Sequence, residues 1–317
     1  MKIRDQEFYN YLSDDTKNKI EQIENHKILG ASKHIEIFCN GLEDIIQSAE
    51  SYEPLDNIKK YLNQLSNYFL ISRGQASRSI YNNIKLIMGT ILGDSVSELK
   101  SNTNLSIRKF KKNSEEDLQK ILEYSVNEFY KYDSFVLFDY SSTVEKVIRK
   151  IANQRENKIN VFIAESSSIN GGLPYLNLAN DDQIKCSFFP DSAVLYKLQA
   201  ADCCLMGAET FYPDGTGFNT IGSDIVSILC RELNKPLYFL TQLNKLDIRR
   251  IEGISKEIVY IDYENENTNS NVDTKIPELV AVPQKNISAY ITEKGVIPSN
   301  QLFKISMEYN EELMKNG

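Results

Sequence analysis

Gly207-Ala208-Glu209-Thr210, followed by Asp214-Gly215-Thr216-Gly217-Phe218-Asn219-Thr220-Ile221-Gly222-Ser223, is the stretch that decides the fold. The apolar residues 203–206 lead into it and predict a buried strand, and the amphipathic residues from about 221 to 233 predict a helix. Open α/β sheets build ligand sites in this way, from a strand, a glycine-rich turn with one carboxylate, and a helix. Glycines let a ligand approach the backbone, and a helix N-terminus offers free N–H groups to an anion. We therefore expect an anionic ligand at this turn.

Short apolar runs alternate with helical stretches from Ser134 onward. The runs predict strands at residues 135–138, 161–164, 186–189, 203–206, 237–240 and 258–261. Between them, amphipathic spacing predicts helices at residues 143–153, 191–199 and 221–233. Such alternation is typical of an α/β domain with a Rossmann-like, doubly wound, mainly parallel sheet that carries helices on both faces.

The first 130 residues are different, because their apolar side chains recur at steps of three and four. We therefore expect a helical N-terminal domain at residues 1–130, followed by the α/β domain at 131–317. The polar residues 264–274 predict a mobile surface loop. Apolar character returns after it, so we expect the C-terminal segment to pack back against the body of the α/β domain.

Composition narrows the possible partners of the chain. Its 317 residues suffice for two domains, and 36 basic against 44 acidic residues, a net charge of −8, argue against nucleic acid as a partner. We find neither a signal-peptide pattern nor a run of about 18 apolar residues, so we expect a cytoplasmic protein without a membrane span. Five cysteines without metal-site spacing and two histidines, His26 and His34, predict no metal site. We expect no cofactor.

Two short motifs point to nucleotide binding, but neither is complete. Asn244-Lys245-Leu246-Asp247 resembles the guanine-reading motif of GTPases, yet the chain contains no Gly-Lys dipeptide for a phosphate loop. Gly215, Gly217 and Gly222 have two residues too many between the second and third glycines for the dinucleotide fingerprint. We therefore set both classes aside.

The chain resembles the family that unites the alpha, beta and delta subunits of initiation factor 2B with the methylthioribose-1-phosphate and ribose-1,5-bisphosphate isomerases. Six segments carry the resemblance in the family's order: Gly30-Ala31-Ser32 with Ser72-Arg73-Gly74-Gln75-Ala76-Ser77; Glu165-Ser166 with Gly172; Asp191-Ser192-Ala193-Val194; Gly207-Ala208-Glu209; Asn219-Thr220-Ile221-Gly222-Ser223; and Ile291-Thr292-Glu293-Lys294-Gly295-Val296. The resemblance implies the same fold, a homodimer or larger homo-oligomer, and a phosphorylated small-molecule ligand.

The chain departs from the isomerases of this family at the residues that carry their chemistry. Those enzymes use a cysteine and an aspartate as an acid/base pair, and the resemblance puts Tyr140 and Glu209 in these places. Ser167 stands where the loop arginine would be, Thr220 replaces a lysine, and Leu29 replaces an arginine. Fewer cations weaken a fixed grip on phosphate.

Three functions remain open. The first is a protein similar to initiation factor 2B that binds a phosphorylated sugar or nucleotide-like metabolite and acts through regulation or assembly. The second is a sugar-phosphate isomerase or related acid/base enzyme with Glu209 at its centre, assisted by Tyr140 or Asp139. The third is a guanine-nucleotide-exchange subunit.

Each candidate residue also has a structural interpretation. The proposed catalytic residues are Glu209, otherwise a solvated turn residue, and Tyr140, otherwise a packing or hydrogen-bonding residue. The proposed ligand-binding residues are Arg73, Gly172, Asp191, Ser192, Gly207, Asn219, Thr220, Gly222 and Lys245. Among these, Asn219 and Asp191 are alternatively helix caps, and Arg73 alternatively pairs with a carboxylate.

Overall fold

The computed structural model describes residues 3–25, 27–28, 30–49, 53–74, 77–263 and 272–316. The chain forms two compact units, one of residues 1–115 with 308–317 and the other of residues 116–307. The division falls inside the long helix α5 (Val96–Phe129) and the last helix α9 (Leu302–Asn316), rather than at the expected boundary near residue 130.

The N-terminal unit is helical, as the spacing predicts. Its helices before α5 are α1 (Asp14–Glu24), α2 (Ala31–Ser48), α3 (Leu55–Phe69) and α4 (Arg78–Met88), and a π-helical turn, Leu70–Gly74, follows α3. The apolar stripe of α2 is buried among the other helices, with Phe38, Leu42 and Ile45 fully enclosed. Burial of this stripe stabilises the unit.

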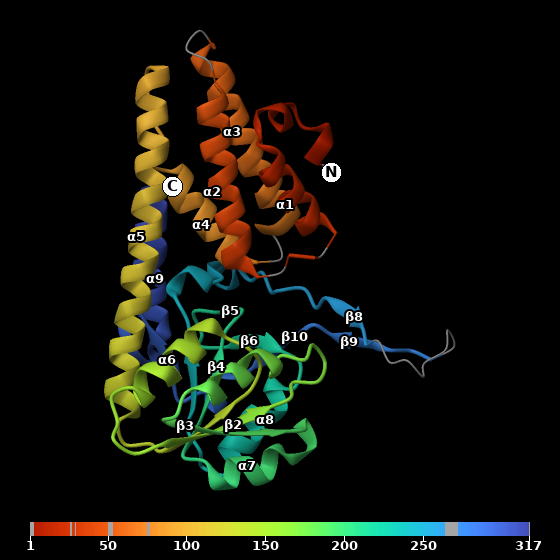
Figure 1. The fold of residues 1–317 in the computed structure, drawn as a ribbon, viewed down its shortest axis with the longest axis vertical. Coiled ribbons are helices and arrows are strands. Elements are labelled where there is room, and N and C mark those ends of the chain that lie inside the picture. Colours follow the sequence, from red (N-terminus) through yellow and green to blue (C-terminus); the bar gives the residue numbers. More distant parts are fainter. Residues whose placement is uncertain are drawn as a thin grey trace. The chain divides into compact units, whose positions relative to one another are not determined.

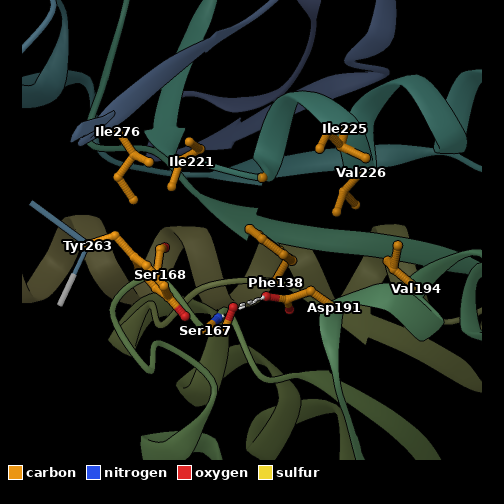
Figure 2. A pocket seen from close by; sticks show the side chains of 11 residues that line it. Phe138, Ser167, Ser168, Asp191, Val194, Ile221, Ile225, Val226, Tyr263 and Ile276 are labelled. Carbon is orange, nitrogen blue, oxygen red and sulfur yellow. Dashed lines mark hydrogen bonds between the residues drawn. The ribbon is translucent and has the colours of Figure 1, made fainter. Parts of the chain in front are cut away.

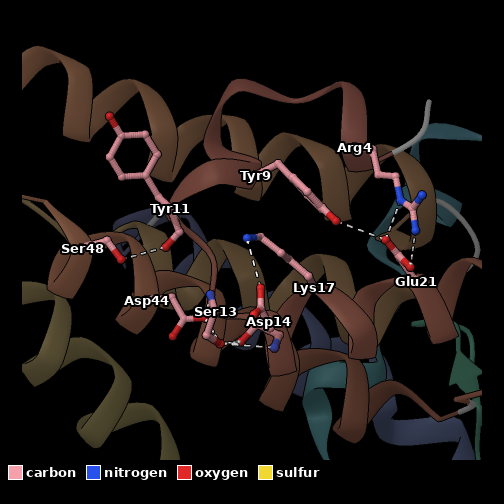
Figure 3. Close-up of polar contacts among 10 residues, drawn as sticks. Arg4, Tyr9, Tyr11, Ser13, Asp14, Lys17, Glu21, Asp44 and Ser48 are labelled. Atoms are coloured by element: carbon pink, nitrogen blue, oxygen red, sulfur yellow. Dashed lines mark hydrogen bonds and ion pairs between the residues drawn. The ribbon is translucent and has the colours of Figure 1, made fainter.

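Polar contacts fix the start of the N-terminal unit (Figure 3). Ser13 caps α1 by accepting the N–H of Thr16, and its hydroxyl donates to Asp44 Oδ2 at 2.8 Å. The guanidinium of Arg4 donates to both carboxylate oxygens of Glu21, at 2.7 and 2.9 Å. The bonds of Arg4 therefore tie the 3₁₀ segment Ile3–Asp5 to α1, and the bond of Ser13 ties the start of α1 to α2.

Within the described residues, the second unit is built on a seven-stranded sheet of order β12-β11-β7-β4-β1-β2-β3. Figure 1 labels β2, β3 and β4 of this sheet. Every neighbouring pair is parallel except β11 with β12. The strands are β1 (Ser134–Leu137), β2 (Ile159–Ala164), β3 (Ile184–Phe189), β4 (Cys203–Gly207), β7 (Leu237–Leu240), β11 (Ala289–Thr292) and β12 (Gly295–Pro298). The predicted helical region followed by a mainly parallel α/β sheet is confirmed.

Helices cover the sheet between successive strands. They are α6 (Ser142–Ala152), α7 (Val194–Ala200) and α8 (Ser223–Glu232). The apolar face of α6 packs with Phe135 and Leu137 of β1 and with the end of α5 in one core. The chain runs from β1 to β2 through α6, and it moves across the sheet in the opposite direction when it passes α7 and α8. Because crossovers between parallel strands are right-handed, this reversal of direction changes the face on which the helix lies. These two helices, which contact each other, therefore cover the other face.

One predicted strand was wrong, and one strand was missed. The apolar run at 258–261 does not enter the main sheet, because β8 (Tyr260–Asp262) forms an exposed antiparallel hairpin with β9 (Lys275–Pro277). The sixth parallel strand is instead β11, which the apolar runs do not predict. Residues 264–271 of the predicted mobile loop lie outside the described residues.

The decisive stretch also contains more structure than a simple turn. After β4 the chain forms a hairpin of β5 (Thr210–Phe211) and β6 (Gly217–Thr220) before α8 begins. Strand β10 (Leu279–Val282), from the C-terminal segment, pairs with β6 and completes a small antiparallel sheet. The prediction of a strand that passes through one turn directly into a helix was therefore wrong, and Asn219 and Thr220 lie on a strand.

Candidate functional site

The sheet has a topological switch point between β1 and β4. From β1 the chain proceeds outward to β2 and β3, then returns to β4 and continues outward on the other side. Ligands of doubly wound sheets bind at the carboxyl ends of the two strands that flank such a point. Two carboxylates follow these strands, Asp139 after β1 and Glu209 after β4.

Asp139 is locked in place by three hydrogen bonds. Its N–H donates to Ser166 Oγ at 2.8 Å, its Oδ1 accepts the N–H of Tyr140 at 2.8 Å, and its Oδ2 accepts the hydroxyl of Thr220 at 2.7 Å. Its backbone has a φ of 61°, a left-handed conformation that is uncommon for residues other than glycine. Strain of this kind concentrates at functional sites.

The environment of Asp139 favours its protonated form. Burial raises the pKa of this carboxyl above its ordinary value of 3.8, and the negative charge of Glu209 raises it further. The bonds from Thr220 and Tyr140 and the positive charge of Lys245 act in the opposite direction, and burial outweighs them. Asp139, Glu209 and Lys245 therefore form one electrostatic cluster at the switch point.

Lys245 holds the two residues that flank Glu209. It ends the 3₁₀ turn Leu243–Lys245 after β7, and its Nζ donates to the carbonyl of Ala208 at 2.6 Å. Its own carbonyl accepts the hydroxyl of Thr210 at 2.8 Å. Because the backbone is fixed on both sides, the exposed side chain of Glu209 projects from a rigid turn.

Asn219 contributes a buried amide. It lies on β6 with 2% of its surface exposed, and within the described part of the chain its Nδ2 has no hydrogen-bond partner. The alternative interpretation of Asn219 as a helix cap was wrong, because the N-cap of α8 is Gly222 and no side chain caps this helix. A buried donor without an acceptor is costly, so this amide is suited to a ligand oxygen.

Gly222 is required where β6 turns into α8. Its φ is +98°, and a Cβ there would lie 2.6 Å from Cζ of Phe138. Ser223, the first residue of α8, is fully buried, and within the described residues its hydroxyl has no hydrogen-bond partner. The helix therefore begins against the end of β1.

Asp191 organises the loop after β2 rather than its own helix. Its Oδ1 accepts the N–H of Ser166 at 2.8 Å, and its Oδ2 accepts the N–H and hydroxyl of Ser167 at 2.8 and 2.9 Å. The helix-cap interpretation of Asp191 was wrong, because the N-cap of its 3₁₀ turn, Asp191–Ala193, is Pro190. Asp191 thus holds Ser166, which in turn accepts the N–H of Asp139.

Two glycines of the predicted set allow close packing around this site. A Cβ at Gly172 would lie 2.0 Å from the carbonyl oxygen of Ala164, so only glycine fits where the loop returns to β2. A Cβ at Gly207 would lie 2.7 Å from Cβ of Ser141, the N-cap of α6. Both glycines therefore serve the frame of the site.

Tyr140 is directed to helix α6. Its hydroxyl donates to Glu145 Oε2 at 2.9 Å, and its ring packs against that of Tyr175 with centroids 5.1 Å apart. Burial, together with the bond to Glu145, raises the pKa of Tyr140 to about 12. A phenol with this pKa is a poor base at neutral pH.

The two remaining candidates are Ser192 and Arg73. Ser192 is exposed on the 3₁₀ turn beside Asp191, and among the described residues no contact of its side chain supports a role. Arg73 belongs to the N-terminal unit, where its guanidinium donates to the carbonyl of Ile23.

A groove of about 370 Å³ lies beside the cluster (Figure 2). Its upper wall in Figure 2 is apolar, with Ile221, Ile225 and Val226 around the start of α8, and its lower wall carries Ser167 and Asp191. The remaining lining residues are Phe138, Ser168, Val194, Gly222, Tyr263 and Ile276. The carboxylate of Asp191 is occupied by the loop, so the groove suits an uncharged group better than a phosphate.

The sequence did not single out two buried carboxylates at this edge of the sheet. Asp139 was predicted only to assist Glu209, although its position directly after an apolar strand indicates a side chain at the carboxyl edge of the sheet. Glu293, after β11, is 8% exposed and was noted only within a motif. The described residues contain no group of three or more His, Cys, Asp or Glu side chains placed to hold a metal ion. Nor, in that part of the chain, is any helix long and apolar enough to span a bilayer.

Comparison with known proteins identifies the family of the chain. The model of the Initiation factor 2 subunit family matches residues 29–299. The chain is 24% identical over 297 residues to a ribose 1,5-bisphosphate isomerase of Archaeoglobus fulgidus, covering 91% of each chain. It is 24% identical to a putative translation initiation factor eIF-2B subunit 2-like protein of Pyrococcus furiosus, covering 88% of this chain and 94% of that one. Its fold matches that of 5-methylthioribose 1-phosphate isomerase from Pyrococcus horikoshii with a TM-score of 0.74, at 17% identity and covering 95% of this chain and 88% of that chain.

We predict that Thr220→Val destabilises the protein more at pH 8 than at pH 4.5. The pKa of Asp139 is already raised, so its contribution to stability is present at low pH and is lost as pH rises through that pKa. Removal of the Thr220 hydroxyl raises the pKa of Asp139 further and leaves its carboxylate with one hydrogen bond fewer, which costs about 1–3 kcal/mol. Urea unfolding at pH 4.5 and pH 8 measures the difference. Thr220→Ser, which keeps the hydroxyl, is the control, and an equal loss at both pH values would contradict the bond.

Proposed function

Because the chain belongs to the initiation factor 2 subunit family, we propose that it binds a phosphorylated sugar or nucleotide-like metabolite at the switch point between β1 and β4. Relatives named for such chemistry include the ribose 1,5-bisphosphate isomerase of Archaeoglobus fulgidus. In this proposal the bound metabolite regulates the protein or its assembly. The protein acts in the cytoplasm.

The buried amide of Asn219 is the observation that carries this proposal. A ligand hydroxyl or phosphate oxygen that accepts from Nδ2 recovers a hydrogen bond that is missing among the described residues. Lys245 provides positive charge for a phosphate, since it lies close enough to lower the pKa of Asp139. Burial lowers the pKa of Lys256, and the nearby carboxylate of Glu209 acts against this change.

We predict that Asn219→Leu weakens ligand binding and leaves the free protein at least as stable. The leucine has a similar volume and removes an unpaired buried donor, whereas loss of one hydrogen bond to a charged ligand costs about tenfold in affinity. Thermal shift with ribose 1,5-bisphosphate, methylthioribose 1-phosphate and AMP measures the effect.

Asn153→Leu is the matched control for this experiment, because Asn153 is exposed at the opposite edge of the sheet. Its ligand response should equal that of the wild type. If none of the three compounds stabilises the wild-type protein, the proposal of a phosphorylated ligand at this site is refuted.

Isomerisation of a sugar phosphate is a second candidate function, favoured by the pairing of Asp139 with Glu209. Aldose–ketose isomerisation needs a base that removes a proton from one carbon and an acid that protonates the neighbouring carbonyl oxygen. Burial raises the pKa of Asp139, which makes it the better candidate of the two for the acid, and the exposed Glu209 on its rigid turn is the candidate base. Two carboxyl groups in different environments are a common arrangement for this division of roles.

We predict that Glu209→Gln lowers turnover of ribose 1,5-bisphosphate by about a hundredfold or more, while its dissociation constant stays within a factor of about ten. Exchange of the sugar C–H for deuterium, followed by NMR, measures the proton transfer. Asp139→Asn should have a similar effect, and Glu257→Gln, an exposed residue, should have none. Unchanged turnover in Glu209→Gln would remove Glu209 from the chemistry.

We also infer self-association through the second unit. The hairpin β8–β9 and the chain before it expose apolar side chains, with Ile258, Val259 and Tyr260 exposed by 63, 48 and 59%. Clusters of this kind mark protein interfaces. We predict a dimer or larger assembly in sedimentation equilibrium at micromolar concentration, and a shift toward monomer in Ile258→Lys. A strictly monomeric wild-type protein would contradict the inference.

A further inference from the structure

Glu293 is a buried carboxylate that the proposed function does not use. It follows β11, so it lies at the carboxyl edge of the main sheet, as Asp139 and Glu209 do. Only 8% of its surface is exposed. A carboxylate in such a position is costly unless it accepts hydrogen bonds.

Both carboxylate oxygens of Glu293 accept the N–H of Leu243, at 3.2 Å each. The N–H of Glu293 itself also bonds to the carboxylate. Leu243 is fully buried and begins the 3₁₀ turn Leu243–Lys245 that follows β7. Glu293 therefore holds the first residue of this turn from the neighbouring strand.

The other end of the same turn holds the backbone around Glu209. Lys245 donates to the carbonyl of Ala208 and accepts the hydroxyl of Thr210, at 2.6 and 2.8 Å. Just beyond the turn, the N–H of Asp247 donates to the carbonyl of Phe211 at 2.9 Å. A continuous path of hydrogen bonds and one short turn thus connects Glu293 to the residues on either side of Glu209.

We propose that Glu293 is a positioning residue whose ionised carboxylate holds the turn Leu243–Lys245, and with it the backbone on both sides of Glu209, and that proton uptake by Glu293 loosens this hold. The proposal rests on the proposed function for the importance of Glu209, but the mechanical coupling is independent of it. A charged acceptor makes a stronger hydrogen bond than a neutral one, so the hold depends on pH.

The surroundings of Glu293 place this change near neutrality. Burial raises the pKa of Glu293 from 4.5 to about 7, against the bond from its own N–H, and the charge of Asp117 adds to the rise. The N–H of Leu243 and the charge of Lys294 lower it. Asp117 lies on α5 and is itself paired with Lys120 at 3.3 Å. Below about pH 7 the carboxyl is neutral, and above it the carboxylate forms.

The raised pKa makes two quantities change in opposite directions. The contribution of Glu293 to the stability of the fold is fully present below its ordinary pKa of 4.5 and is lost as pH rises from there to about 7. The hydrogen bond to Leu243 instead strengthens as the carboxylate forms around pH 7, because its acceptor becomes charged. A general loosening of the fold cannot produce this opposite pair of trends.

Amide NMR of the perdeuterated protein tests the coupling without a ligand. In a titration from pH 5.5 to 8.5, the amide signals of Leu243 and Glu209 should shift with one shared midpoint near pH 7. Glu293→Gln, an uncharged variant of the same shape, should abolish this shared transition and fix both signals near their low-pH positions. Asp117→Asn should move both midpoints to lower pH together, because it removes a charge that raises the pKa of Glu293.

Binding of ribose 1,5-bisphosphate by calorimetry tests the consequence. The wild type should bind about fivefold more tightly than Glu293→Gln at pH 8, and the two should be equal at pH 6. Comparison of the two proteins at each pH removes the titration of the ligand phosphates.

Two outcomes would overturn the proposal. One is a Leu243 amide that does not titrate near pH 7, or a Glu209 amide whose titration is the same in Glu293→Gln. The other is a ratio of affinities that does not change between pH 6 and pH 8. If ribose 1,5-bisphosphate does not bind to the wild type at all, the binding proposal fails for this compound, and the amide titrations still decide the role of Glu293.

Discussion

The site depends on one buried carboxyl group, that of Asp139, at the end of the central strand. It connects three segments that are distant in sequence: β1, the loop after β2 through Ser166, and β6 through Thr220. The left-handed backbone of Asp139 persists because these bonds fix both its N–H and its side chain. The loop must also come close, and a Cβ at Gly171 would lie 2.4 Å from Asp139 Oδ1. The small sheet that carries Asn219 is therefore anchored to the main sheet at this point.

Much of the fold could be predicted from local patterns, and the errors have a common physical cause. Strands buried on both faces produce apolar runs, so β1, β2, β3, β4 and β7 were found within two residues of their observed bounds. The run at 258–261 has the same β-branched composition, but it lies in an exposed hairpin. The strand β11 is short and ends in polar residues. Neither composition nor periodicity determines which strand pairs with which, because that choice depends on tertiary packing.

The candidate site was predictable only where one segment contains both the glycines that shape the backbone and the candidate functional side chain. Glu209 and Asn219 lie in the glycine-rich stretch, so the sequence singled them out. The bond between Thr220 and Asp139 joins residues 81 positions apart, and no local pattern reveals it. The contact made by the Tyr140 hydroxyl could not be predicted either, because the resemblance gives the place of Tyr140 in the sequence but not its bond to Glu145. The unpaired amide of Asn219 is likewise a property of the folded chain.

Two buried carboxyl groups with raised pKa values, Asp139 and Glu293, lie at the same edge of the sheet. Burial of the charged form is the largest cause of the raised pKa in each case, and the hydrogen bonds to each carboxylate do not fully offset it. A neutral residue of the same shape at either position would remove that cost. Residues that reduce stability and yet hold other groups in fixed positions are typical of functional sites. The cost is concentrated at Asp139, which accepts the hydroxyl of Thr220, and at Glu293, which holds the turn Leu243–Lys245. The energetics of the fold therefore indicate the same location as the topology of the sheet, by an independent argument.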